Sequence, residues 1–312
     1  MIFTFLKGAV DIVVLGSVAQ DTYLYVRGGF SLGCSRVAES FRIGGGGSAA
    51  NTAVALARLG LKVGFLGAVG ADDVGSFLKE DLMREGIDVS QVQVLKDHLS
   101  SRVYVIVDLD SGERGMVGLR DACNFLQIRS MEYISQSSLL HVSGYMLQEE
   151  PGRSRTLEIM RKAKELGVTL SLDLTQEIAQ RSLIKRAGEI DFLLGNESEF
   201  RLLGYEPSEM SLKIARRELG CQNIVVKLGA RGSAALMGDE FIHKGAFRVK
   251  VVDTTGAGDA FNAGFLYGII KQYSAEDCLE IGNALGAYAC IGEGARHLPK
   301  KEEVELMLGR KI

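Results

Sequence analysis

The densest group of residues that could do chemistry is Asp-Thr-Thr-Gly-Ala-Gly-Asp-Ala-Phe at positions 253–261, which leads into a predicted helix. The backbone N–H groups of Gly256, Ala257 and Gly258 would be unpaired at the start of that helix, and such small side chains let an oxyanion approach. Asp259 is a poor anion ligand, but it could be a general base that takes a proton from a hydroxyl attacking a bound phosphate. The pattern predicts a phosphoryl-transfer site; the alternative is a glycine turn with an aspartate near a helix start.

A second glycine cluster, Gly-Gly-Gly-Gly-Ser-Ala-Ala-Asn at positions 44–51, also runs into a predicted helix. Gly44, Gly46 and Ala49 match the GxGxxG/A pattern of dinucleotide-binding proteins, which would make the chain an NAD-dependent oxidoreductase. That pattern should meet an acidic residue about 20 positions later, but the next acidic residues here lie in an unrelated segment. We therefore favour close approach of a polyhydroxylated ligand, with Asn51 as hydrogen-bond donor and acceptor, over a dinucleotide or a tight turn without a ligand.

These motifs need a scaffold to position them, and the chain alternates predicted strands with predicted helices. Short apolar runs rich in β-branched residues, beginning with 10–16, are typical of strands buried on both faces. From residue 139 onward the alternation is regular enough to predict βαβ units and a parallel sheet. The predicted strands are 10–16, 63–68, 139–142, 168–173, 191–194, 224–227, 233–237 and 241–248, and the predicted helices are 48–59, 74–85, 154–166, 259–271 and 275–291.

Other segments differ in character from this alternation. Residues 22–43 carry aromatic side chains among polar residues and glycines, as strands of an exposed sheet would. Residues 102–108 and 113–119 are predicted to pair around a turn at Asp-Ser-Gly. Together they predict a small, split sheet beside the main one.

Composition excludes several function classes. The chain has 312 residues, 36 basic against 39 acidic side chains and a net charge of -3, so no nucleic-acid partner is expected. Its five cysteines have neither a CxxC pair nor zinc-site spacing, which indicates buried free thiols in a reducing compartment. The sequence has no run of 18 apolar residues and no signal-peptide pattern, so we expect a cytoplasmic protein without a membrane partner.

The two glycine motifs, in this order and spacing, resemble the signatures of the ribokinase or PfkB carbohydrate kinase family, and the resemblance covers essentially the whole chain. Gly46, Gly47 and Asn51 resemble the first signature, and positions 253–261 match the second almost letter for letter. The resemblance implies one α/β domain over residues 1–312, a ribokinase-like, Rossmann-type three-layer sandwich whose mostly parallel sheet has helices on both faces. It also implies a small β-sheet lid, formed by about 22–43 and 100–120, and ATP-dependent phosphorylation of a sugar hydroxyl.

The resemblance carries roles over to individual residues. The residues implied in catalysis are the base Asp259 and the anion-hole residues Gly256, Ala257 and Gly258. The residues implied in sugar binding are Asp21, Gly46, Gly47 and Asn51. Without the resemblance, Asp21 would be equally well explained as a helix cap or turn residue. Ala19 departs from the family pattern, because ribose-phosphorylating members often carry asparagine there.

The resemblance also implies a nucleotide side of the site, made of Asn196, Glu199, Lys227, Gly229, Gly232 and Asn283. Asn196 and Glu199 match an NxxE element that organises Mg²⁺ and phosphate through water, although alone they would be an N-capped helix start. The loop from Lys227 to Gly232 resembles the cover of the nucleotide phosphates and ribose. Asn283 lies where the family encloses adenine, on a helix face that could equally serve packing.

A potassium site found in many members is implied at Asp253 and Thr255, together with backbone carbonyls near 292–294.

The substrate is expected to be a small sugar, with a ketose or a 2-keto sugar acid of the fructose or 2-keto-3-deoxygluconate type in first place. Arg120, which follows the second predicted lid strand, could bind a carboxylate or keto oxygen, or could be a surface arginine. Ribose or a nucleoside is the alternative substrate, and a sugar sensor without catalysis is the alternative function. Unpaired edges of the lid strands favour a homodimer through the lid.

Overall fold

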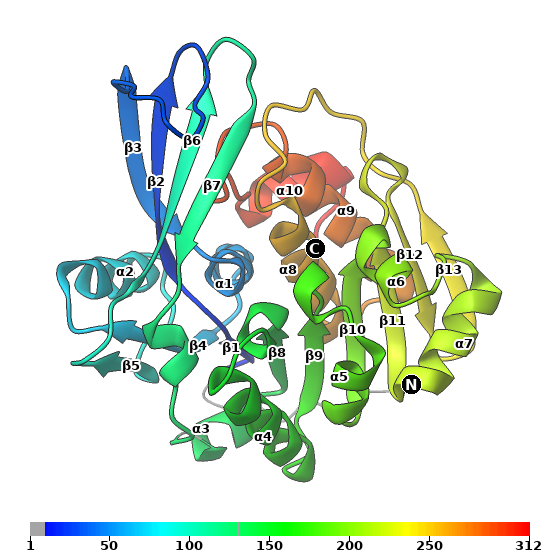
Figure 1. Ribbon diagram of the computed structural model, residues 1–312. Coiled ribbons are helices and arrows are strands. Elements are labelled where there is room, and N and C mark those ends of the chain that lie inside the picture. The colour runs from blue at the N-terminus through cyan, green and yellow to red at the C-terminus, as the bar shows by residue number, and fades with distance from the viewer. Residues whose placement is uncertain (1–9, 130) are drawn as a thin grey trace.

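A nine-stranded sheet forms the centre of the computed structural model, which describes residues 10–129 and 131–312 (Figure 1). Residues 1–9 and 130 of the predicted domain lie outside the described residues. In spatial order the strands are β13 (Glu240–Lys244), β12 (Ser233–Met237), β11 (Cys221–Lys227), β10 (Ile190–Asn196), β9 (Thr169–Asp173), β8 (Leu139–Ser143), β1 (Ile12–Leu15), β4 (Val63–Gly70) and β5 (Val92–Leu95). The strands from β11 to β5 are parallel, and β12 and β13 are antiparallel. Chain order therefore reverses at β1, and such a switch point is where open α/β sheets bind ligands.

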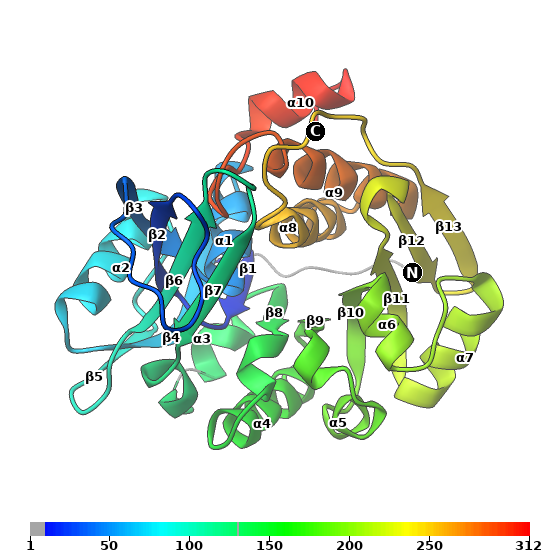
Figure 2. The same cartoon turned by 45° about the horizontal axis from the view of Figure 1, so that its top comes forward.

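Helices cover both faces of this sheet because alternate strand residues point to opposite sides. Ile12 and Val14 share an apolar cluster with α1, α2, α8 and α9, whereas Val13 and Leu15 share another with α4, α5 and α7. Figure 2 shows α8 and α9 on one side of the sheet and α4 and α5 on the other. The helices are α1 (Ser48–Arg58), α2 (Asp73–Arg84), α3 (Met131–Ser135), α4 (Gly152–Glu165), α5 (Arg181–Arg186), α6 (Glu197–Leu202), α7 (Glu209–Leu219), α8 (Ala257–Ile270), α9 (Ala275–Ala289) and α10 (Lys301–Leu308). This arrangement confirms the predicted α/β sandwich.

Helix α8 carries the second glycine signature into the core. Every residue from Ala260 to Ile269 is buried, as the nearly uniform apolar character of this segment predicts. Its close contact with α9 depends on small residues, since a Cβ atom on Gly264 would lie 2.8 Å from the Ile281 carbonyl oxygen. The position of α8, and of any group on its first turn, is thereby fixed from both sides.

A second, four-stranded sheet stands beside the main one (Figure 1). Its strands, in spatial order, are β3 (Ser40–Gly46), β2 (Ala19–Val26), β6 (Ser101–Asp108) and β7 (Arg114–Leu119). β2 pairs with β6 in parallel, and the two edge strands pair antiparallel to their neighbours. β3 leads directly into α1, so this sheet is connected to the main body at the first glycine cluster.

Two predicted strand regions are shorter in the structure than in the sequence analysis. Residues 27–39 form a loop between β2 and β3. The predicted strand 241–248 ends at Lys244, because β13 is an edge strand and the Asn283 amide holds the carbonyls of Lys244 and Gly245, each over 3.2 Å. The chain after Lys244 leaves the sheet as an extended segment that reaches α8.

Several elements were not predicted from the sequence. They include α5, α6, α7, α10, β5 and four 3-10 helices, which are η1 (Ala122–Phe125), η2 (Gly144–Leu147), η3 (Gln176–Ile178) and η4 (Gly229–Arg231). Among the described residues, no helix is long and apolar enough to cross a membrane. All five cysteines are free; Cys123, Cys221 and Cys278 are buried, whereas Cys34 and Cys290 are partly exposed, which corrects the expectation for those two.

Candidate functional site

The second glycine signature forms a turn that aims backbone donors at one point. Gly256 caps α8 with φ 79°, and a Cβ atom there would lie 2.7 Å from the Ala295 carbonyl oxygen, so only glycine fits. No described residue provides an acceptor for the amides of Gly258 and Asp259, whereas the Ala257 amide donates to the Thr254 carbonyl over 3.2 Å. Together with the helix dipole, the unpaired amides can hold an anion.

Asp259 lies on the first turn of α8, in a carboxylate-binding arrangement provided by α1. Ser48 Oγ donates to Asp259 Oδ1 over 2.6 Å, and Asn51 Nδ2 donates to Oδ2 over 2.8 Å. Burial raises the pKa of Asp259 to about 6, although these two hydrogen bonds oppose the shift. A carboxylate with this pKa is ionised at neutral pH and basic enough to accept a proton.

Asp21 lies on β2 and faces the first glycine cluster. A Cβ atom on Gly46 would lie 2.1 Å from Asp21 Oδ2, so glycine at this position leaves room for the carboxylate. Burial raises the pKa of Asp21 to about 6, while the Arg296 and Arg42 charges oppose the shift. No described residue donates a hydrogen bond to this carboxylate. It can therefore accept hydrogen bonds from the hydroxyl groups of a ligand.

Three polar side chains end neighbouring parallel strands below α8. Asp173 is the last residue of β9, Asn196 of β10 and Lys227 of β11. Lys227 Nζ donates to Asp173 Oδ1 over 2.7 Å and to Asn262 Oδ1 over 3.1 Å. Burial disfavours the ammonium, but the carboxylates of Asp173 and Glu199 outweigh it and raise the pKa of Lys227. A permanent positive charge therefore lies beneath the first turn of α8.

Asn196 and Glu199 form a capping box at the start of α6. Glu199 Oε2 accepts from the Asn196 amide over 2.7 Å, and Asn196 Oδ1 accepts from the Glu199 amide over 2.9 Å. Burial is the main cause that raises the pKa of Glu199 to about 7. Its other carboxylate oxygen accepts no hydrogen bond from the described residues, so it fits a water-mediated contact to Mg²⁺, which needs few protein oxygens.

A cavity of about 490 Å³ opens beside these groups. Phe247, Val249, Val251, Phe261 and Ala287 form much of its wall, and such an apolar slot suits a purine ring. The predicted nucleotide residues that also line it are Lys227, Gly229, Gly232 and Asn283. The Asn283 side-chain amide donates to the backbone carbonyls of residues 244 and 245, so it holds that segment of the chain against the cavity.

The side chains of Asp253 and Thr255 do not fit the potassium site that the resemblance implies. Asp253 Oδ1 accepts from the Thr255 amide over 2.9 Å, from Thr255 Oγ1 over 2.6 Å and from the guanidinium of Arg114. Asp253 Oδ2 accepts from the Gly294 amide over 2.9 Å. Three donors crowd Oδ1 and one reaches Oδ2, and one of the four is an arginine that already supplies the positive charge.

Arg120 lies close to the site but is held by protein groups. Its guanidinium donates to Gln148 Oε1 and, over 2.6 Å, to the Tyr145 carbonyl oxygen, and it stacks 5.7 Å from the centre of the Tyr145 ring. Burial raises the pKa of Tyr145, and the charges of Glu177 and Asp259 add to this. Arg120 is thus linked through Tyr145 to the region around the buried carboxylates.

Comparison with known proteins agrees with this geometry. The model of the pfkB family of carbohydrate kinases matches residues 9–302. This chain belongs to the pfkB carbohydrate kinase family. It is an ATP-dependent carbohydrate kinase, and the NAD-dependent and non-catalytic alternatives are wrong. In the structure, Gly44 and Gly46 of the GxGxxG-like pattern belong to an antiparallel edge strand of the small sheet, where a dinucleotide fingerprint does not occur.

Two sequence relatives and one solved structure illustrate the similarity. The kinase is 32% identical over 287 residues to a 5-dehydro-2-deoxygluconokinase from Clostridium tetani, which covers 85% of this chain and 84% of the relative. It is 32% identical over 276 residues to an ATP-dependent ribose-1-phosphate kinase from Halopiger xanaduensis, covering 88% and 90% of the two chains. A ribokinase of Arabidopsis thaliana, solved with ribose and ATP, superimposes with a TM-score of 0.83 at 25% identity and covers 96% of this chain and 99% of that one.

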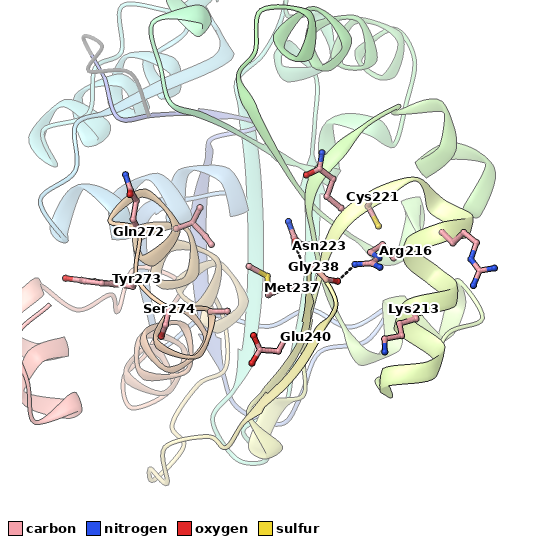
Figure 3. A pocket seen from close by; sticks show the side chains of 14 residues that line it. Lys213, Arg216, Cys221, Asn223, Met237, Gly238, Glu240, Gln272, Tyr273 and Ser274 are labelled. Atoms are coloured by element: carbon pink, nitrogen blue, oxygen red, sulfur yellow. Dashed lines mark hydrogen bonds between the residues drawn. The ribbon is translucent and has the colours of Figure 1, made fainter. Parts of the chain in front are cut away.

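Another cavity lies elsewhere, between α7, the β12–β13 turn and the end of α8 (Figure 3). Its volume is about 930 Å³, and Ile269 on its wall lies about 15 Å along α8 from Asp259, given the helical rise per residue. Arg216 donates to the Gly238 carbonyl, and the Gly238 amide donates to Asn223 over 2.9 Å (Figure 3). This cavity takes no part in the site of the kinase.

Several site residues were not predicted from the sequence. Ser48 could have been found, because Ser48 and Asn51 share one face of the first turn of a helix. Asp173 could also have been found, since it ends a buried parallel strand where ligands bind. Nothing in the sequence pairs Arg114 with Asp253, which lies 139 positions away.

Removing the charge of Lys227 should destabilise the kinase strongly. In Lys227→Met the mostly buried Asp173 carboxylate loses its partner, and breaking such a pair costs about 3–5 kcal/mol. Urea denaturation would measure the free energy of unfolding. The double variant Asp173→Asn/Lys227→Met should recover part of the loss; equal losses in the single and double variants would contradict a coupled pair.

Proposed function

We propose that the kinase transfers the γ-phosphoryl group of ATP to a hydroxyl of a small sugar, with Asp259 as the catalytic base. The observation that carries this proposal is the ionisable Asp259 carboxylate, fixed by Ser48 and Asn51, beside unpaired amides at the start of α8. A hydroxyl between Asp259 and those amides loses its proton as it attacks the phosphoryl group. The amides of Gly256, Gly258 and Asp259, which donate to no described residue, then stabilise the charge on the transferred group.

The nucleotide occupies the apolar cavity in this proposal, with its phosphates directed at the start of α8. Lys227 supports the phosphate charge from below, and Gly229 and Gly232 allow the loop to lie against the phosphates and ribose. Glu199 and Asn196 would hold Mg²⁺ through water. When bound, Mg²⁺ neutralises charge on the phosphates.

The acceptor lies between Asp21 and the first glycine cluster. Asp21 accepts hydrogen bonds from the sugar hydroxyls, Gly46 and Gly47 let the sugar approach the backbone, and Asn51 orients it beside Asp259. The small sheet closes over the acceptor as a lid, so that water does not compete as the nucleophile. The lid and the sandwich act as one kinase domain.

For the substrate, we propose a ketose or a keto sugar acid, including the 5-dehydro-2-deoxygluconate class. Support comes from the Clostridium relative and from Arg120, whose guanidinium could pair with a carboxylate or keto oxygen after exchange with Gln148. Ribose or a nucleoside is the second candidate, favoured by the ribokinase and ribose-1-phosphate kinase among the relatives. The five free cysteines and the use of ATP support a cytoplasmic location.

We further propose a homodimer formed through the outer face of the small sheet, defined by Phe41, Ile43, Tyr104, Val117 and Leu119. By strand register these residues point away from Asp21, and they are 41–72% exposed. A second copy of the chain presents the same face, so pairing covers both apolar surfaces at once. The lids of the two copies would then support each other.

Replacing the base should abolish turnover. The wild type is given Mg-ATP and one acceptor at a time, and ADP release is measured. The acceptors are fructose, 2-keto-3-deoxygluconate, 5-dehydro-2-deoxygluconate, ribose and nucleosides. Turnover of the preferred sugar should fall by about 10²–10⁴-fold in Asp259→Asn, because the acceptor hydroxyl keeps its proton. Asp73→Asn, on the first turn of α2, is the matched control and should keep full activity. If a sugar binds but no sugar in the panel leads to release of ADP from ATP, the result counts against the proposal.

Activity should fall as the pH drops through about 6, since protonated Asp259 cannot accept a proton. Ser48 stabilises the charged carboxylate, so Ser48→Ala should raise the pKa of Asp259. The acidic limb of the kcat profile should then move to higher pH by about half a unit to one unit. Thr52→Val is the control, because Thr52 donates to the Asp259 backbone carbonyl. A limb that moves equally in both variants, or in neither, would contradict this assignment.

The wild type should sediment as a dimer, at about twice the 33.7 kDa chain mass. Val117→Asp places a charge in the outer face and should give a monomer by analytical ultracentrifugation. Met116 lies next to Val117 but on the opposite face of β7, so the Met116→Asp variant should remain dimeric. A monomeric wild type at micromolar concentration would end the dimer proposal.

A further inference from the structure

An ion pair joins the small sheet to the loop in front of α8. Arg114 begins β7, and its guanidinium donates to the carboxylate of Asp253. Asp253 is the first residue of the segment that ends in the anion-binding turn at Gly256. The side chain of Arg114 is 31% exposed and that of Asp253 is 12% exposed, so the contact is largely shielded from water.

The loop needs a cation at this position. Burial would raise the pKa of Asp253, but the Thr255, Arg114 and Gly294 donors lower it to about 2, so the carboxylate is charged throughout the working range. An uncompensated negative charge only three residues before Gly256 would repel an anion held by the amides of α8. A guanidinium remains charged at every relevant pH and offsets this repulsion.

Arg114 already occupies the place of a cation at this carboxylate. Its two oxygens accept from the Thr255 amide, Thr255 Oγ1, the Gly294 amide and Arg114, and the Thr255 hydroxyl is itself committed to Asp253. The donors of Thr255 and Gly294 hold two separate loops against this one side chain. Arg114 completes that arrangement from the small sheet.

The opposite edge of the small sheet touches the same region. Arg42 on β3 stacks 4.5 Å from the centre of the Tyr23 ring and donates to the Glu293 carbonyl over 3.4 Å. In Figures 1 and 2 the sheet lies beside the loops that precede α8 and follow α9. Both edge strands of the small sheet therefore contact the loops around Asp253.

We propose that Arg114 is a positioning residue that replaces a monovalent cation at Asp253, so that the lid itself delivers the charge that orders the anion-binding turn. This inference rests on the proposed function. It makes the kinase independent of potassium and couples order in residues 253–256 to closure of the lid. Opening the lid withdraws the charge and weakens the phosphate site in the same movement.

The test compares Arg114→Met and Arg114→Lys with Arg27→Met, a lid variant that removes the same charge from a side chain paired with Glu39 and Asp110 instead of Asp253. Arg27 lies at the same end of the lid as Arg114, but it pairs with Glu39 and Asp110, so its loss leaves the contacts of the Asp253 loop intact. Calorimetry measures the affinity for Mg-AMPPNP in potassium or tetramethylammonium salt at constant ionic strength. Hydrogen exchange of the amides of 253–256 and 293–295 provides a readout that needs neither nucleotide nor acceptor.

We expect the wild type and Arg27→Met to bind Mg-AMPPNP equally well in both salts. Arg114→Met should bind Mg-AMPPNP about tenfold more weakly in tetramethylammonium salt, because a displaced loop weakens the site. Its amides in both loops should exchange faster, and potassium should restore part of its affinity for Mg-AMPPNP. Arg114→Lys should fall between the two. The inference is overturned if potassium tightens wild-type binding about tenfold, or if Arg114→Met matches Arg27→Met in exchange and affinity. Failure of the proposed kinase activity would instead appear in the acceptor panel, with these loop measurements unchanged.

Discussion

The hydrogen bonds from α1 to the carboxylate of Asp259 are the constraint on which the rest of the site depends. α1 begins at the glycine cluster that ends β3, and α8 begins at the anion-binding turn, so these bonds tie the acceptor side to the nucleotide side. Ser48 and Asn51 can reach Asp259 only because α1 and α8 pack closely through small residues. A shift of either helix would separate the base from one of the two substrates.

Burial determines the charge state of the groups around this point. It raises the pKa values of Asp21 and Asp259 to about 6 and that of Glu199 to about 7, while Lys227 stays charged beside Asp173. These three carboxylates are thus poorly hydrated, and few cations lie near them. In the proposed mechanism, hydroxyl groups and Mg-ATP supply the missing donors and positive charge, so that binding relieves part of the cost of burying these groups.

The sequence motifs predicted the centre of the site well, because local constraints fix that part. Gly256 must be glycine for its positive φ, and Asp259 follows on the first helical turn, so residue type and spacing carry the information. The parallel sheet was also predictable, because short apolar strand segments alternate regularly with helical segments along the chain. Arg114 was not, because its contact depends on how the small sheet is placed over the main body, and no local pattern encodes that placement. The end of β13 was missed because a side chain from α9 decides where the strand stops.

The distance along the chain between Asp259 and its donors has a consequence for synthesis. Ser48 and Asn51 precede Asp259 by 211 and 208 positions, so the base cannot be oriented until α8 has been made and packed on α1. The strand that opens the acceptor side, β2, is among the first elements to be synthesised, whereas α9 comes near the end. A growing or truncated chain therefore has no assembled phosphoryl-transfer site and cannot consume ATP before the fold is complete.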